Sequence, residues 1–550
     1  MSDKLQSGSP RLRESIARLE RYRQGKRRLD ARLYDEAMWW QSRHETAPAE
    51  GDSRRSGKPV SAWLFNSICN KHADLCDRMP VCTALPREPG DRADAALLSA
   101  VLPVVAARCR LKKTYSDNAW IKLRHGTAVY GVFWNPALEN GIGDIDIRRV
   151  DILNLFWEPG VTDIQDSPHL YLVGLEDRAA LESRYPVLAE AVRQGRLDPD
   201  STPADGASLL GSGGSYLLRE RDGCPEKYTV VDWYYRKALP DGRTVLHYAK
   251  YVGDILLYAS ENDPACAERG WYDHGLYPFV PDVLFSEADS PAGYGLIAVG
   301  RNPQGYIDEL DGHILEYANW ASRVRYWAKR SLGINEKEFL DPDRRIIQVE
   351  GDMDEEKLRQ ITLSPMDGML SEVRQMKIEE LKETTGTRDV NQGMSGGVTA
   401  ASAITALQEA GDKSSRDCVS GSYRAYVAVM EQVVELIRQF YTGTRCFRIA
   451  GDGGWKYIRY SNRGLRDRVT GTDAAGNPLR RRPVFDIDVR AERENPLDRA
   501  GRNELMLSLF RAGMFDPDRR AAAALALSDM DFDGIDALRA AVAPAAGDSE

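Results

Sequence analysis

The chain has no long apolar run. Its 550 residues contain no stretch near the roughly 20 apolar residues that a membrane-spanning helix needs. Residues 1–10 lack the apolar segment of a secretory signal peptide. The eight cysteines are scattered, which is more typical of buried thiols than of a disulfide framework. The sequence therefore predicts a cytoplasmic protein without a membrane partner.

Signatures of catalysis are also missing. Residues 51–58 imitate a phosphate-binding loop, but five residues separate the two glycines instead of four, and Pro59 replaces the magnesium-binding Ser or Thr. Residues 529–534 imitate a calcium-binding loop, yet Ala540 stands where its twelfth position needs a carboxylate. The seven histidines form no H-E-x-x-H pair. We therefore expect no catalytic residues and no cofactor.

A metal site is not indicated either. Cys69, His72, Cys76 and Cys82 lie close in sequence, but three of them share one predicted helix and no paired C-x-x-C motif is present. Packing of that helix is the simpler interpretation.

The chain also lacks an excess of basic residues. It has 74 Lys and Arg against 83 Asp and Glu, a formal net charge of -9. A protein that holds DNA tightly neutralises phosphates with a basic excess or a strongly basic face. Any DNA that this chain handles is therefore expected to be passed along.

Periodicity divides the chain into an α+β part and a helical part. Helices are expected at 11–45, Trp63–Met79 and Asp94–Asn118, the first docking through its aromatic end, Met38-Trp39-Trp40. Alternating apolar and polar residues then predict strands, separated by turn residues. These strands are Thr127–Trp134, Asp144–Val150, Leu170–Leu175, Tyr228–Arg236 and Arg243–Tyr258, the last with a turn at Gly253-Asp254.

Long helices dominate the later part. Asn302-Pro303 predicts a helix start, and apolar residues spaced by 3, 4 or 7 continue that helix to about Leu332. A second helix begins near Pro365 and ends at Gly386. A third pattern, Thr399–Tyr441, would span on the order of 60 Å. Its ends are apolar and its glycine-interrupted middle, Gly411–Ser422, is polar, which favours a kink and contacts with neighbouring subunits.

Strands are expected again near Tyr457–Tyr460 and Phe485–Val489, before short alanine-rich helices at 499–541. Between the first two long helices, the charged residues 336–364 include one expected strand at Ile346–Val349.

This order of parts resembles the portal protein of tailed bacteriophages, most closely that of short-tailed phages. In the body, the similar stretch is Val150–Pro159. Before the first long helix, it is Gly293-Tyr294-Gly295 with Asn302-Pro303-Gln304. After it, Glu379–Gly386 with the glycines of 393–397 is similar to the second long helix and the loop that follows. The resemblance covers most of residues 60–540, as an arrangement more than as identities.

The resemblance implies a portal fold with eight segments. Residues 1–59 would form an N-terminal helical arm, 60–302 an α+β wing, 303–333 and 365–388 two stem helices, 334–364 a clip, 389–399 a tunnel loop, 400–498 a long kinked wing helix with strands, and 499–550 a helical crown and tail.

It also implies a function. The family forms rings of twelve subunits at one capsid vertex, through which double-stranded DNA is packaged, retained and ejected. The implied partners are the terminase large subunit, head-completion or tail-adaptor proteins, and capsid and scaffolding proteins. The protein would be part of the virion, present in the host cytoplasm during assembly.

Two groups of residues would face DNA. The tunnel loop would present Asn391, Gln392, Gly393, Met394, Ser395, Gly396 and Gly397. The stem would present Arg323, Arg325, Lys329, Arg330, Arg374, Lys377 and Lys382.

Other interpretations remain open at this stage. The loop can be a flexible connector without a DNA role, and the stem cations can be solvated or paired with acidic groups. The chain can also be another phage head or connector protein with long helices, or a nucleic-acid-processing enzyme with an unfamiliar site.

Overall fold

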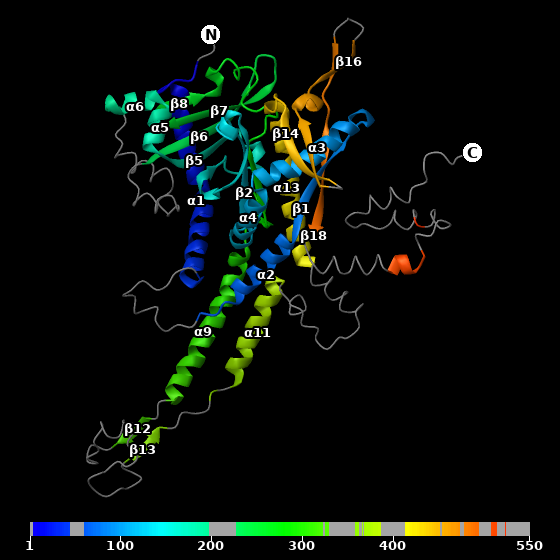
Figure 1. The fold of residues 1–550 in the computed structure, drawn as a ribbon. Coiled ribbons are helices and arrows are strands. Elements are labelled where there is room, and N and C mark those ends of the chain that lie inside the picture. The colour runs from blue at the N-terminus through cyan, green and yellow to red at the C-terminus, as the bar shows by residue number, and fades with distance from the viewer. Residues whose placement is uncertain are drawn as a thin grey trace.

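The computed structural model shows a broad body of helices and sheets from which two long helices project (Figure 1). The fold is of the α+β kind expected from the sequence. The structure describes residues 4–44, 60–196, 227–322, 325–328, 358–361, 366, 368–386, 413–451, 454–472, 478–493, 508–513 and 523.

A five-stranded antiparallel sheet forms one side of the body, with the strand order β4-β5-β6-β7-β8. Aromatic residues alternate along its central strands, and Tyr171 lies opposite Trp233. The strands predicted here are confirmed, including the turn at Gly253-Asp254 between β7 and β8. Their bounds are β4 Leu155–Phe156, β5 His169–Asp177, β6 Lys227–Ala238, β7 Thr244–Val252 and β8 Ile255–Ala259, and α5 (Arg178–Arg184) and α6 (Pro186–Arg193) follow β5.

Helix α1 (Pro10–His44) runs past this sheet. Its aromatic end is docked as expected, with Trp40 buried, but Leu12, Leu19 and Tyr22 are also buried against the sheet. The helix is therefore attached along its length rather than only at its end. Gly25 allows this close approach, because a Cβ there would lie 2.3 Å from the ring of Pro159.

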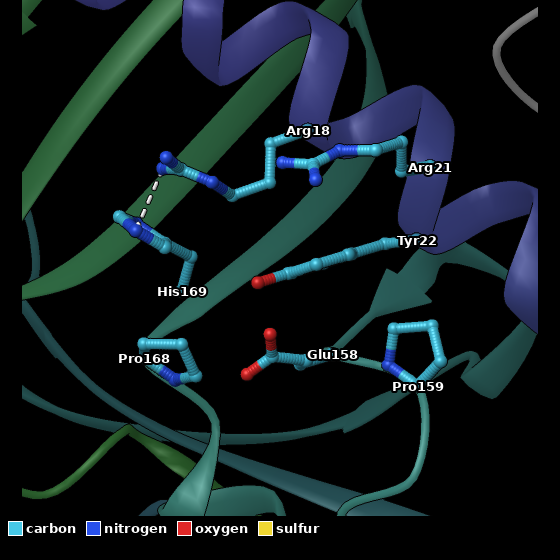
Figure 2. Close-up of a pocket in the computed structure, with 7 residues that line it drawn as sticks. All are labelled: Arg18, Arg21, Tyr22, Glu158, Pro159, Pro168 and His169. Carbon is cyan, nitrogen blue, oxygen red and sulfur yellow. Dashed lines mark hydrogen bonds between the residues drawn. The ribbon is translucent and has the colours of Figure 1, made fainter.

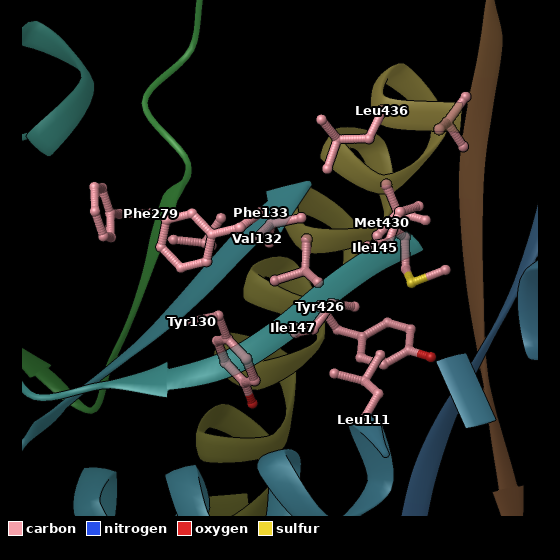
Figure 3. Close-up of a cluster of buried hydrophobic side chains, with 14 of the residues drawn as sticks. Leu111, Tyr130, Val132, Phe133, Ile145, Ile147, Phe279, Tyr426, Met430 and Leu436 are labelled. Atoms are coloured by element: carbon pink, nitrogen blue, oxygen red, sulfur yellow. The ribbon is translucent and has the colours of Figure 1, made fainter. Parts of the chain in front are cut away.

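A three-stranded sheet with the order β3-β2-β9 packs against helix α13 (Lys413–Phe440). Figure 3 shows Tyr426 and Met430 of this helix among side chains of the sheet such as Ile145 and Ile147. Val429, also in α13, is fully buried in the same cluster. The strands are β2 Thr127–Asn135, β3 Asp144–Val150 and β9 Phe279–Val283, of which the first two match the prediction.

This packing corrects the interpretation of the apolar stripe at the C-terminal end of the predicted helix Thr399–Tyr441. The sequence assigned the stripe to contacts between subunits, but Val433, Leu436 and Ile437 are buried by the same chain. Strands β2, β9 and β18, together with α2, supply the cover that a single domain was expected to lack. Within the described residues the helix is continuous from Lys413 to Phe440. Residues 399–412 of the expected helix, including Gly411, lie outside the described residues.

The second predicted helix, Trp63–Met79, is shorter than expected, because strand β1 (Arg78–Pro86) follows it directly. The sequence extended that helix to Met79, but α2 (Trp63–Asp77) ends earlier, and β1 pairs along its whole length with β18 (Phe485–Arg493). Pro80 fits this two-stranded ribbon, because proline is tolerated at strand edges.

The third expected helix is also divided. Residues Asp94–Asn118 contribute to α3 (Arg92–Arg108) and α4 (Leu111–His125), which are separated at Arg110 by a left-handed φ of 52°.

The first projecting helix begins and ends earlier than expected. Helix α9 runs Leu296–Ser322, so Pro303 lies inside it rather than at its start. The predicted helix continued to Leu332, but β12 (Arg325–Ala328) pairs with β13 (Leu358–Ile361) instead. The expected strand Ile346–Val349 and the helices at 499–541 lie outside the described residues, apart from 508–513 and Ala523.

The remaining elements are short or lie near the end of the chain. Helix α11 runs Gly368–Thr385, beside α9. The late strand predictions are confirmed, with two hairpins before β18. These elements are β10 (Phe285–Ser286), β11 (Gly293–Tyr294), β14 (Arg445–Gly451), β15 (Gly454–Tyr460), the short helix η8 (Asn462–Leu465), β16 (Arg468–Thr472) and β17 (Pro478–Arg481).

A buried ion pair fixes the polar part of α13. Lys122 of α4 donates to Asp282 of β9 at 2.6 Å and to Ser422 of α13 at 2.8 Å. Its Nζ also reaches the carbonyl oxygen of Cys418 at 3.1 Å. The Lys122 and Asp282 side chains are 0% and 2% exposed. Hydrogen bonds within the chain therefore satisfy these polar groups.

Removing this lysine should destabilise the body. Lys122→Met leaves Asp282 buried without its counter-charge, and the loss of one partner of a buried pair typically costs about 3–5 kcal/mol. We expect a reduction of that size in the free energy of urea unfolding. Lys113→Met, on the exposed side of the same helix, is the control, with a change within about 0.5 kcal/mol. Equal stability of both variants would contradict this role for Lys122.

Candidate functional site

The projection made by α9 and α11 is the most distinctive feature of the fold (Figure 1). Its base is anchored in an apolar cluster, in which Ile307, Ile378 and Leu381 pack with Leu64 and Ile68 of α2. The cluster also includes Cys418 and Val419 of α13, so the projection and the long helix share one support.

A polar network fastens the same base. Gln304 is almost fully buried; its Oε1 accepts the N–H of Leu64 at 3.0 Å, and its Nε2 donates to Ser61 and Asp308. Asp308 also accepts hydrogen bonds from the backbone and hydroxyl of Ser61, at 3.0 and 2.8 Å. Because a buried amide is costly when unpaired, this network sets the direction in which α9 leaves the body.

The candidate stem cations that the structure describes are engaged within the chain. Arg374 of α11 forms an ion pair with Asp311 of α9, which ties the two helices together. Lys377 lies 2.6 Å from Glu380 and over the ring of Tyr306. Lys382 lies over the ring of Trp63, 5.5 Å from its centre.

The other DNA-facing candidates are not located. Arg323, Lys329 and Arg330 lie outside the described residues, and Arg325 is placed on β12 without a described side chain. All of the candidate tunnel loop, Asn391 to Gly397, lies outside them as well.

Sequence analysis missed the outward surface of the projection. Tyr306, Leu315 and Met376 are 57%, 50% and 63% exposed, although each lies on a helix that packs within the chain. Both helices therefore present apolar side chains that the described part of the chain leaves exposed. Apolar surface of this kind is typical of contacts with another molecule. The stripe expected on this helix consists of Ile307, Leu310, Ile314, Ala318, Ala321 and Ala328. Among its members with described side chains, Ile307 alone is fully buried, so spacing did not separate the inner face from the outer one.

A pocket of about 430 Å³ lies between α1 and the five-stranded sheet (Figure 2). Arg18 and Tyr22 of α1 face Glu158 and His169 across it. Burial, and the charges of Arg18 and Arg11, lower the pKa of His169 to about 4, so its ring is neutral at pH 7.

The ring nitrogens of this histidine face the indole N–H of Trp233, at 3.2 Å, and Arg18, at 2.6 Å. They do not face a nucleophile that the ring could activate. The pocket therefore attaches α1 to the sheet and offers no nucleophile-base pair.

The cysteine and histidine cluster is also structural. His72 stacks on Trp120 with ring centres 4.4 Å apart, and Cys76 Sγ lies 3.4 Å from its Nε2. Cys82 is buried on β1, and this burial raises the pKa of its thiol to about 11. Among the described residues, no group of three or more His, Cys, Asp or Glu is arranged to hold a metal ion. Within the same part of the chain, no helix is long and apolar enough to cross a membrane.

Comparison with known proteins identifies the later part of the chain. Residues 322–549 match the family of the phage P22-like portal protein. No curated protein matches the chain. The matched family is a structural phage component rather than an enzyme family.

The matched region begins at the end of α9 and includes α11, α13 and both late hairpins. It thus covers the second helix of the projection and the long helix that shares its support. The match of residues 322–549 to the P22-like portal family confirms the resemblance to a portal protein of the short-tailed phage type, a part of the head-to-tail connector that acts in DNA packaging.

Proposed function

We propose that this chain forms a closed ring of twelve copies at one capsid vertex, with the α9/α11 projection as the stem around a DNA channel. The observation that carries this proposal is the uncovered apolar surface of the projection, represented by Tyr306, Leu315 and Met376. Portal membership implies a ring oligomer in the phage head. Neighbouring copies in such a ring are the natural cover for these side chains, because closed rings arise from repeated head-to-tail contacts.

The parts of the ring follow from this assignment. In the proposal, 60–302 form the wing, 303–333 and 365–388 the stem, 334–364 the clip and 389–399 the tunnel loop. Residues 400–498 continue the wing, and 499–550 form the crown. The clip binds the terminase large subunit during packaging and head-completion or tail-adaptor proteins afterwards, and the wing and crown contact capsid and scaffolding proteins.

The stem charges suit a conduit for DNA. Each phosphate that a protein neutralises increases its affinity for DNA, and tight contacts would resist sliding. The Arg374–Asp311 and Lys377–Glu380 pairs satisfy cations within the stem. The described stem can therefore approach DNA without fixed, unpaired positive charge at these positions.

Electron microscopy of the purified protein tests the ring directly. We expect rings with about twelvefold symmetry and a central hole wide enough for duplex DNA. Monomers under all assembly conditions would exclude the portal assignment for this chain. An assembly without a central hole, or one that does not close into a ring, would favour another connector protein.

The stem ion pair gives a second test. Arg374→Glu places two carboxylates opposite each other, and we expect fewer rings and a lower thermal midpoint. The double variant R374E/D311R restores the opposite charges and should recover most of both. Lys377→Gln, a neighbouring cation on α11, is the control with little effect on assembly. Failure of the double variant to recover would show that Arg374 acts through something other than Asp311.

The tunnel loop gives a third test. Deleting Gly393–Gly397 should leave rings intact, because this segment of glycines, one serine and one methionine brings little apolar surface to contacts between copies, while DNA packaging or retention declines. Packaging at the parent level would remove the proposed role of the loop.

A further inference from the structure

The late hairpins form a basic segment in an acidic chain. Residues 441–482 contain ten Lys or Arg and three Asp, although the whole chain has a net charge of -9. Nine of the ten cations are arginines. A local excess of this size indicates a partner of negative charge, provided that the cations are not all neutralised within the fold.

Four of these cations form ion pairs within the chain. Arg445 reaches Asp144 at 3.6 Å, Arg481 reaches Glu88 at 2.8 Å, and Arg482 reaches Asp467 at 3.1 Å. Arg468 pairs with Asp94. These arginines join the hairpins to the body and to each other.

Of the other six cations, Arg448 is exposed but makes a contact within the chain, and five more are exposed. In the part of the chain that the structure describes, none of the five has a carboxylate, carbonyl or ring partner. Two belong to β15, two lie at and just after η8, and one belongs to β17. They are Lys456, Arg459, Arg463, Arg466 and Arg480.

The register of the first hairpin places part of this charge on one surface. Arg448 lies opposite Tyr457, and Cys446 lies opposite Arg459. Because side chains on a strand alternate between its faces, these four share one face, and all are exposed. Tyr457 is 69% exposed. The other face buries Phe447, which attaches the hairpin to the body.

The segment that directly follows the hairpin also exposes cations. In η8, Asn462 and Leu465 are buried, while Arg463 and Arg466 are exposed. We call Arg448, Tyr457, Arg459, Arg463 and Arg466 the basic face. Figure 1 places β14 and β16 at the end of the molecule opposite to β12 and β13, so this surface is not part of the projection.

We propose that the basic face binds the phosphate backbone of double-stranded DNA, at a site separate from the channel. Arginine presents a planar set of donors that matches phosphate oxygens, and an exposed tyrosine hydroxyl is a further donor to the backbone. Duplex DNA is chosen over an acidic protein because the matched family acts in DNA packaging. This inference depends on the proposed function in one respect, which is that double-stranded DNA is present where the protein acts.

The salt dependence of DNA binding tests this site on the full chain. Binding of a short duplex is measured by fluorescence anisotropy over a series of salt concentrations, with the triple variant R459Q/R463Q/R466Q. Each lost phosphate contact lowers the slope of log affinity against log salt by about 1, so we expect a reduction of about 2 to 3. Arg13, Arg27 and Arg28 of α1 are equally exposed and unpaired among the described residues, so R13Q/R27Q/R28Q is the matched control, with a slope change below 1.

Two results would overturn the site. One is a parent-like slope for R459Q/R463Q/R466Q, and the other is an equal loss in the α1 control. Polyglutamate serves as a second probe: loss of its binding with unchanged DNA binding would assign the face to an acidic protein instead. Microscopy of the same variant separates this question from the ring, because intact rings with unchanged DNA binding refute the basic face and leave the portal proposal standing.

Discussion

The buried pair between Lys122 and Asp282 is the constraint on which the rest of the body depends. A buried charge that water does not reach must keep its ion-pair and hydrogen-bond partners. Loss of a partner leaves an uncompensated ion in an apolar interior. This pair holds α4, β9 and α13 together, three elements that are distant in sequence. The cluster that supports the projection includes residues of α4 and α13, so the position of the projection depends on the same contact.

Strands and turns that depend on residues close together in the sequence could be predicted. The sequence located β2 and β3 closely, although β2 is buried on both faces. The Gly253-Asp254 dipeptide located the turn between β7 and β8, because glycine and aspartate favour turns. Long-range pairing was not readable. The residues of β1 fit either the end of a helix or an edge strand. They form a strand because they pair with β18, which lies far away in the sequence.

The same limit explains the correction to α13. Periodicity shows that a helix has an apolar face, but not which molecule covers it, and here the chain covers its own stripe. The argument for a ring through this helix was therefore wrong, although the family match supports the portal assignment. The uncovered apolar surface lies on α9 and α11 instead, where the sequence stripe did not distinguish inside from outside. Of the candidate DNA-facing cations, sequence could not show that Arg374 meets Asp311, because the two lie on different helices.

The ribbon of β1 and β18 has a consequence for biogenesis. A ribosome finishes β1 roughly 400 residues before it makes the partner strand. During that interval the backbone donors and acceptors of β1 have no ladder, and an unpaired strand edge attracts other chains. Pairing across so long a separation is also slow, because the entropy of closing the loop must be overcome first. The body is thus completed only after β18 has been made, so a nascent chain cannot present its finished surfaces to other copies before then.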